Sequence, residues 1–217
     1  MNSVPAEVWS IFVLSLGVSG TAVMVSCAAG MPMGVWLGLH DFSGKSIVRA
    51  LIFTGMAVPP VVVGLLLYLL LSRSGPLGSW EWLFTRRAMI LAQVLLDLPF
   101  VVGITMTAID AIPRELLFQL RSLGASSWQL RCTLLSEAEP GLLLAFATAL
   151  GRSISEVGAV LIVGGNIGGH TRVMTTAIVL ETSRGHFAMA VGLGAILLLV
   201  ALLINFLVAC LQGRIAQ

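Results

Sequence analysis

Three ionisable residues lie inside long apolar stretches of the sequence: Asp97, Arg152 and Glu156. A lone charge at the centre of a lipid-embedded helix costs roughly 2.5–3.5 kcal/mol, so such residues face protein or water and find partners. Arg152 and Glu156 are four positions apart, so on a helix they would share a face and could pair. Asp97 could reach Arg152 from another helix. With Ser155, these residues could line or gate a path for a charged solute, or they could form a buried ion-pair cluster.

Other side chains give no sign of a catalytic or metal centre. Recognition of an oxyanion would need Arg, Ser, Thr or backbone N–H donors, which Arg152 and its serine neighbours supply. The glycine-rich segment Gly164–Gly169 could cradle an anion with its backbone N–H groups or could simply be a tight turn. The histidines are scattered and the three cysteines lie far apart, so we expect no metal site, no redox pair and no enzyme.

The composition decides the class of protein. The chain is 58% hydrophobic and 10% charged, whereas soluble domains carry about 25% charged residues. A soluble fold of this composition would expose large apolar patches. We therefore predict an all-α integral membrane protein, with residues 1–217 forming a single transmembrane domain. The net charge of +2 is too small to suggest a nucleic-acid partner.

A bilayer core of about 30 Å needs about 20 apolar residues per helix. The first apolar stretch is longer than this, so it is either strongly tilted or turns out of the membrane at Pro32. Pro59 and Pro60 must kink or break the second stretch. A short amphipathic or re-entrant piece is expected at Val173–Gly185. The predicted spans are about Val8–Leu39, Ala50–Leu71, Ala88–Ile109, Pro140–Val163 and Phe187–Leu211.

The segment at about 110–139 is the longest that is not apolar throughout. Its apolar residues recur at helical spacing, which predicts an amphipathic helical loop. If this loop is cytoplasmic, five spans place the N-terminus outside and the C-terminus inside. Cytoplasmic segments then hold six Lys and Arg residues and external segments five, a weak positive-inside bias. The Gly44-Lys45-Ser46 triplet lacks the glycine that a phosphate-binding loop needs at position 39, so we expect no nucleotide site in this chain.

The segment Leu123–Trp128, followed by Pro140-Gly141, resembles the cytoplasmic loop of ABC-importer permeases. Gly124 matches the glycine of that loop, whereas Phe118-Gln119-Leu120 and Ser136-Glu137 depart from its pattern. Gly30–Gly38 and Val58–Gly78 are similar to the first core helix of that family and to its next helix and loop. Gly151–Gly185 resembles the molybdate, sulfate and tungstate branch. Three elements most resemble tungstate permeases: Leu-Ser-Glu-Ala (Leu135–Ala138), Glu-Val-Gly-Ala (Glu156–Ala159) and Val-Gly-Gly-Asn-Ile (Val163–Ile167).

The resemblance implies a type I ABC importer permease in a prokaryotic inner membrane, importing tungstate or molybdate. It implies a homodimer in lipid, two separate ABC ATPases that bind ATP and Mg, and an extracytoplasmic oxyanion-binding protein. A coupling helix around Arg121–Gln129 would dock on the ATPase. The implied docking residues are Arg121, Leu123, Gly124, Ala125, Ser126 and Trp128, and the external mouth is implied at Gly164, Gly165, Asn166 and Thr171.

Two alternatives remain open from the sequence. An ion-coupled secondary transporter or channel subunit would use Asp97 and Glu156 for protons or cations, and it predicts an inverted repeat, which is not visible. A purely structural membrane subunit would not need a docking loop. Neighbouring genes for an ATPase and a binding protein would favour the importer.

Overall fold

A computed structural model describes residues 3–215, and the side chains of residues 7–210 except those at positions 114, 117, 127 and 131. Within this range the chain is helical and contains no strand, which confirms the all-α prediction. The helices are α1 (Ser3–Leu39), α2 (Lys45–Ala57), α3 (Pro60–Leu71), α4 (Arg86–Asp110), α5 (Arg114–Ser122), α6 (Ser127–Glu137), α7 (Glu139–Ser155), α8 (Gly158–Gly164), α9 (Met174–Ser183) and α10 (Phe187–Ile215).

Three helical segments are long and apolar enough to cross a membrane, namely Glu7–Leu39, Arg86–Asp110 and Phe187–Cys210. Two bent helix pairs, α2 with α3 and α6 with α7, pass the same test when each pair is taken together, which gives up to five spans. The prediction of about five spans therefore agrees with the structure. The boundaries of the second and fourth spans, however, differ from those predicted.

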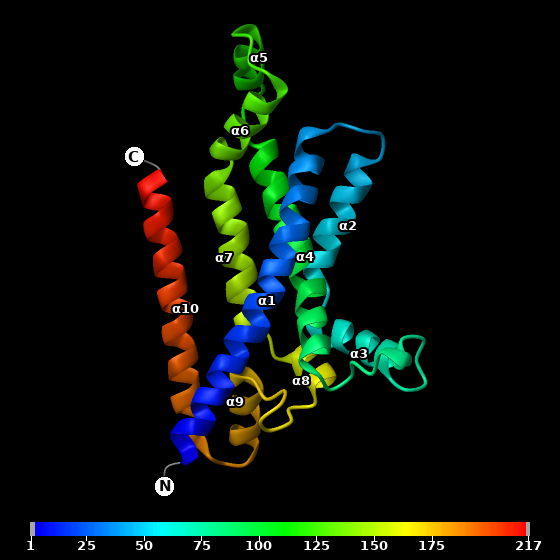
Figure 1. The fold of residues 1–217 in the computed structure, drawn as a ribbon, viewed down its shortest axis with the longest axis vertical. Coiled ribbons are helices and arrows are strands. Elements are labelled where there is room, and N and C mark those ends of the chain that lie inside the picture. Colours follow the sequence, from blue (N-terminus) through cyan, green and yellow to red (C-terminus); the bar gives the residue numbers. More distant parts are fainter. Residues whose placement is uncertain (1–2, 216–217) are drawn as a thin grey trace.

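The second span is broken at its two prolines. Val58 and Pro59 adopt extended backbone conformations, and α3 leaves α2 at an angle of 93°. A proline lacks the N–H that would continue the helix, and it restricts the residue before it to extended conformations. The predicted break is confirmed. The predicted helix Ala50–Leu71 is replaced by two helices that run in different directions (Figure 1).

The fourth span also differs from the prediction. Pro140–Val163 is not one helix, because α7 ends at Ser155, Glu156 is extended and the short α8 begins at Gly158. α7 instead follows α6 across a bend of 57°. The alternative that the first span turns outward at Pro32 is wrong as well, since α1 continues through Pro32 to Leu39.

α1 and α4 are joined by a seam of close contacts. Glycines on α1 lie against α4, and a Cβ added to Gly34 would lie 2.6 Å from the Cβ of Thr105. Gly30 and Gly38 face Val101 and Ile109 in the same way, with the same offset in the sequence. The two helices are therefore parallel (Figure 1). Glycines at every fourth position of α1 thus allow α4 to approach closely.

The largest cluster of buried apolar side chains lies where α3, α4 and α8 meet. It includes Leu67 and Leu71 of α3, Met89 of α4 and Val160 and Val163 of α8. α10, in contrast, exposes most of its apolar surface, with Leu198 72% and Phe206 62% exposed. A surface of this kind suits contact with lipid.

The two ends of the molecule differ in construction. α5 and α6 protrude beyond the other helices at one end, where α1 ends, α2 begins and α10 ends (Figure 1). We call this the α5–α6 end. The start of α1, the start of α10 and the whole of α9 lie at the opposite end, which we call the α9 end.

Candidate functional site

Three helices share a set of buried polar contacts near the break in the fourth span. Gln93 of α4 donates from Nε2 to the carbonyl oxygen of Ser153 at 2.8 Å, and the hydroxyl of Ser19 on α1 donates to the same oxygen at 3.1 Å. All three residues are buried. The last carbonyls of a helix have no partner within it, and lipid offers none. Gln93 and Ser19 therefore stabilise the end of α7 at this position.

Asp97 lies one turn of α4 beyond Gln93, and its side chain is 1% exposed. It interacts electrostatically with Arg152 and Glu156, and its carboxyl lies close to the Ser153 hydroxyl. No hydrogen bond of standard geometry joins these two groups, and no ion pair joins Asp97 to Arg152 among the described residues. The structure thus brings Asp97, Arg152 and Glu156 into one neighbourhood, as predicted, without the predicted ion pairs.

The predicted pairing of Arg152 with Glu156 is wrong. It required a continuous helix, whereas α7 ends between the two residues at Ser155. The Arg152 guanidinium lies 4.4 Å from the ring centroid of Phe100, a cation–π contact. Ser155 is exposed, and its hydroxyl donates back to the Gly151 carbonyl at 2.8 Å.

Glu156 links three helices. Its Oε1 accepts a hydrogen bond from the backbone N–H of Ala159 at 3.1 Å, near the start of α8. Its backbone carbonyl accepts one from the Thr175 hydroxyl of α9 at 2.8 Å. A carboxylate that binds a free N–H at a helix start stabilises that helix. Glu156 is therefore a joint between α7, α8 and α9.

The glycine-rich loop after α8 is tied down by Thr171. This side chain is 1% exposed, and its hydroxyl donates to the Gly164 carbonyl and accepts from the Ile167 N–H at 3.0 Å. Gly165 and Asn166 both have positive φ, 68° and 50°. The hydroxyl of Thr171 is thus engaged inside the loop, and the predicted mouth residues form a compact turn.

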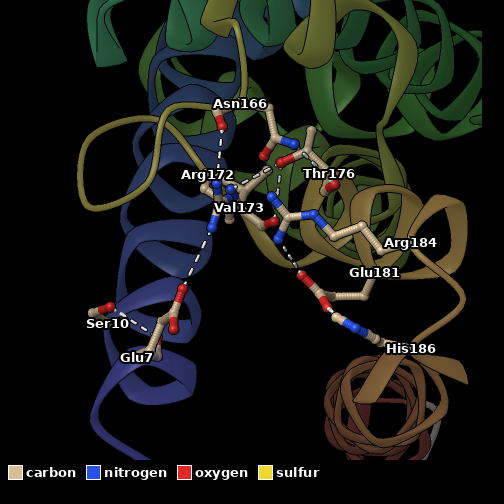
Figure 2. A network of polar contacts seen from close by, with 9 residues as sticks. All are labelled: Glu7, Ser10, Asn166, Arg172, Val173, Thr176, Glu181, Arg184 and His186. Carbon is tan, nitrogen blue, oxygen red and sulfur yellow. Dashed lines mark hydrogen bonds and ion pairs between the residues drawn. The ribbon is translucent and has the colours of Figure 1, made fainter. Parts of the chain in front are cut away.

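One ion pair and two hydrogen bonds hold the same loop against its neighbours (Figure 2). Arg172 lies 3.4 Å from Glu7 of α1, and its other terminal nitrogen donates to the Asn166 carbonyl at 3.5 Å. The Asn166 side chain donates to the carbonyl of Thr176 on α9 at 3.4 Å. The loop is therefore fixed between α1 and α9.

A second group in Figure 2 closes the turn between α9 and α10. Nδ1 of His186 lies 2.7 Å from Glu181, and Arg184 lies 3.2 Å from the same carboxylate. The hydrogen bond with His186, together with the charge of Arg184, lowers the pKa of Glu181 although partial burial opposes the shift. This carboxylate is consequently held in its charged form.

At the other end of the molecule, α5 and α6 form a helical hairpin. α5 ends at Ser122, Gly124 has φ +79°, and α6 begins at Ser127. The Ser126 hydroxyl accepts from the Gln129 N–H at 3.3 Å, and the Gln129 side chain accepts from the Ser126 N–H at 2.8 Å. This capping box starts α6, and the left-handed glycine ends the turn after α5. The predicted single helix over Arg121–Gln129 is wrong: the range spans the end of α5, the turn and the first turn of α6.

The tip of this hairpin carries exposed apolar side chains. Leu123 is 84% exposed, Trp128 73% and Phe118 66%. Ala125 is half-buried, and Arg121, Gly124 and Ser126 are exposed beside them. Clustered apolar side chains on a protruding segment indicate a protein interaction site. Every predicted docking residue lies at this tip.

The family model for the inner membrane component of binding-protein-dependent transport systems matches residues 30–217. The chain belongs to this family. The resemblance to ABC-importer permeases is therefore confirmed, and the protein is a multi-pass membrane permease, a transport subunit. The family is not one of ion-coupled secondary transporters, the alternative that the sequence left open.

Relatives of this permease are named as permeases for an anion, for tungstate and for molybdenum. A protein of Haloferax volcanii named "Probable anion ABC transporter permease protein" is 45% identical over 210 residues, which cover 94% of this chain and 90% of the relative. The tungstate uptake permease of Peptoclostridium acidaminophilum is 40% identical over 206 residues, with 95% and 90% covered. The molybdenum transport permease of Escherichia coli K12 is 31% identical over 178 residues, with 78% of each covered.

Solved structures share the fold of this permease. A chain of the MetNI methionine ABC transporter in an inward-facing conformation aligns with a TM-score of 0.76 at 20% identity, covering 98% of this chain and 95% of that one. A bacterial alginate ABC transporter, solved in complex with an alginate pentasaccharide-bound periplasmic protein, aligns with a TM-score of 0.73 at 22% identity, covering 96% and 79%. The predicted type I importer fold is confirmed.

The sequence did not single out Gln93, Ser19 or Thr175, whose side chains stabilise the break between α7 and α8. One signal was present. Gln93 is a polar residue within an apolar span and lies one helical turn before Asp97, so the two share a face.

Proposed function

We propose that this permease imports a tetrahedral oxyanion, tungstate in the first place and molybdate as the alternative, in an ATP-driven ABC importer. The observation that carries the proposal is the 40% identity to a tungstate uptake permease over 95% of the chain. Near Glu156, the Nε of Arg152 and the hydroxyl of Ser153 have no hydrogen-bond partner among the described residues, and guanidinium and hydroxyl groups are donors that bind oxyanions.

ATP and Mg would be bound by a partner ATPase, since the present chain offers a docking surface in place of a nucleotide-binding loop. Two ATPases would bind a homodimer of permeases, one at each α5–α6 hairpin. The exposed Leu123 and Trp128 at the tip support this role, because buried aromatic anchors dominate protein–protein binding. An extracytoplasmic binding protein would deliver the oxyanion at the α9 end, near Gly164, Gly165 and Asn166.

The docking role implies an orientation of the chain. With the α5–α6 end in the cytoplasm, α1 would begin outside and α10 would end inside, because the start of α1 lies at the α9 end and α10 ends at the α5–α6 end (Figure 1). Lys45 and Arg49 lie at the cytoplasmic end in this orientation, in keeping with the positive-inside rule.

The transport path would pass the break between α7 and α8, with Asp97, Arg152, Ser155 and Glu156 as its lining or gate. Movement of the hairpin would change the joint at Glu156 and so open or close the path. Irregular backbone at membrane depth is tolerated where it lies within protein or lines a water-filled path, which supports this placement.

Reconstituted transport tests the proposal. The permease, its ATPase and its binding protein are placed in proteoliposomes, and uptake of tungstate, molybdate and sulfate is measured with ATP and without it. Calorimetry of the binding protein with the same oxyanions identifies the preferred ligand. Oxyanion uptake that needs ATP supports the proposal, whereas uptake driven by an ion gradient without the ATPase would refute it.

A further inference from the structure

One carboxylate at the α5–α6 end joins two helices. Asp110, the last residue of α4, lies 3.4 Å from the ammonium of Lys45 and forms an ion pair with Arg49. Lys45 also pairs with Asp41 at 3.2 Å. Lys45 is the first residue of α2 and Arg49 lies one turn later. The first turn of α2 is therefore attached to the end of α4 by charge.

Apolar packing and charge together hold α2 against its neighbours. None of the side chains of α2 is fully buried. Val48 in its first turn and Ile52 one turn later pack against a cluster of Leu37, Val102 and Met106. At the first turn, the ion pairs with Asp110 add a charged contact to this packing.

Asp110 is also the point at which the bundle passes into the hairpin. Only the short link after α4 separates it from α5. A cavity of about 240 Å³ lies between the ion-pair cluster and the hairpin, lined by Lys45 and Asp110 on one side and by Phe118, Arg121 and Leu134 on the other. The hairpin is therefore not packed tightly onto the bundle here, and its displacement would act on the end of α4.

The other end of the α2–α3 pair touches the candidate gate. α3 follows α2 after the 93° bend, and a Cβ on its Gly64 would lie 2.7 Å from the Cα of Ala159 in α8. A Cβ on Gly158 would in turn lie 2.8 Å from Val61 of α3. α3 and α8 are thus in backbone-level contact directly after Glu156. Closely packed helices of this kind shift together.

We propose that Asp110 is a positioning residue for transport: its ion pairs with Lys45 and Arg49 make α2 and α3 follow the α5–α6 hairpin, so that displacement of the hairpin shifts α8 at the Glu156 joint. This inference rests on the proposed function, in which the hairpin receives the movement of the ATPase. It assigns part of the transmission to the charge contact between α4 and the first turn of α2, beside the apolar packing of the same helices.

The experiment compares Asp110→Asn and Arg49→Gln, which remove the contact from either side, with Arg184→Gln as the control. Arg184→Gln removes the ion pair of Arg184 with Glu181, at 3.2 Å, in the turn between α9 and α10. For each variant in proteoliposomes we measure basal ATPase activity, its stimulation by the loaded binding protein, and oxyanion transported per ATP hydrolysed.

We expect Asp110→Asn and Arg49→Gln to keep basal ATPase activity but to transport about 5-fold less oxyanion per ATP, the scale on which residues between coupled sites act. Arg184→Gln should keep the wild-type ratio of oxyanion to ATP. The exchange of charges in the double variant Arg49→Asp with Asp110→Arg should recover most of this ratio. If both single variants keep the wild-type ratio, or if Arg184→Gln lowers it equally, the proposal is wrong. Should Asp110→Asn fail to assemble, Arg49→Gln decides.

A second readout does not require oxyanion transport. Spin labels at Ile47→Cys on α2 and Gln119→Cys on α5 report the distance between them, in a protein whose exposed Cys132 and Cys210 are replaced by serine; both labelled positions are exposed. When the ATPase and ATP are added, we expect the distribution of distances between the labels to stay narrow in the labelled protein without further substitution. In Asp110→Asn we expect this distribution to broaden. Broadening in both proteins alike would overturn the inference. If uptake is absent while the distance result holds, it is the proposed substrate that fails.

Discussion

The carboxylate of Glu156 accepts a hydrogen bond from the backbone N–H of Ala159, at 3.1 Å. α8 thus begins on a side chain that belongs to the end of α7, and the Thr175 hydroxyl holds the same residue from α9. A residue that the sequence suggested as one half of an ion pair is instead the joint at which the fourth span breaks.

This joint predicts a difference between two substitutions. Glu156→Gln keeps an oxygen that can accept from Ala159, so it should preserve the fold and much of the transport. Glu156→Ala removes the acceptor and should lower the free energy of unfolding by about 1 kcal/mol, the usual effect of losing a helix cap. Uptake should fall more in the alanine variant than membrane insertion does. Equal uptake in wild type and Glu156→Ala would show that the joint has no part in transport.

The turn at Gly124 predicts a loss of coupling. A Cβ added at Gly124 would have nothing within 4 Å, so Gly124→Arg causes no clash at this atom. The substitution strains the backbone, because φ is +79°, and it places a charge at the docking tip. The protein should remain inserted, while ATP hydrolysis no longer drives uptake. Gly185→Arg, in the turn between α9 and α10, is the matched control, since Gly185 also has φ +79° and nothing lies within 4 Å of an added Cβ. The two variants behaving alike would contradict the assignment.

The exposed tryptophan at the hairpin tip predicts a specific effect on ATPase binding. Trp128→Ala should weaken the affinity of the permease for its ATPase by about 10-fold or more, because an aromatic anchor buried in an interface contributes at least 1–2 kcal/mol. Trp80→Ala, at the α9 end and 49% exposed, should leave this affinity unchanged. Affinity is measured by titrating the labelled ATPase onto permease in nanodiscs. An unchanged Kd for Trp128→Ala would place the docking surface elsewhere.

The contact between α3 and α8 predicts a loss of stability. Gly64→Ala places a methyl group 2.7 Å from the Cα of Ala159, and this contact can be relieved only by moving the backbone. Overpacking of this kind costs about 1–3 kcal/mol. Gly20→Ala on α1 is the control, because nothing lies within 4 Å of its added methyl. The melting temperature in detergent should fall below that of the wild type for Gly64→Ala and stay unchanged for Gly20→Ala. Equal melting temperatures of the two variants would disprove the close packing of α3 and α8.

The turn between α9 and α10 predicts a dependence on pH. The pKa of Glu181 is lowered by the hydrogen bond with His186 and by Arg184, so the folded protein binds a proton there less readily than the unfolded chain does. This contribution to stability is present above the usual pKa of a glutamate, about 4.3, and is lost as the pH falls through the lowered value. The melting temperature, measured from neutral to acid pH, should fall as this contribution is lost. In Glu181→Gln the melting temperature should depend less on pH. An unchanged dependence on pH would contradict a stabilising role of the Glu181 carboxylate.

The sequence predicts those parts of the fold that local chemistry determines. Pro59 and Pro60 predict the break between α2 and α3. The glycines at every fourth position of α1 are the local feature that permits its close packing against α4. The capping box of Ser126 and Gln129 is also a local signal, and with Gly124 it would have predicted the helical hairpin in place of one coupling helix.

The break after Ser155 could not be predicted in this way. Its stretch contains no proline, and Arg152 and Glu156 have the spacing of a continuous helix. The chain can leave the helix there because Gln93, Ser19 and Thr175, all distant in the sequence, bind the freed carbonyls of Ser153 and Glu156. The ion pairs of Asp110 are equally non-local, since they depend on where the turn before α2 places Lys45 and Arg49.

The seam between α1 and α4 also bears on how the protein is made. The glycines of α1 emerge first, but their partners on α4 are not complete until Asp110 has been synthesised, after the whole broken span of α2 and α3. During translation the first helix therefore stays in the bilayer, or bound to a chaperone, with its glycine face not yet covered by α4. The order of synthesis thus separates insertion of the chain from closure of its principal helix pair, and a nascent chain arrested before α4 should carry an exposed site for helix association that the finished permease has buried.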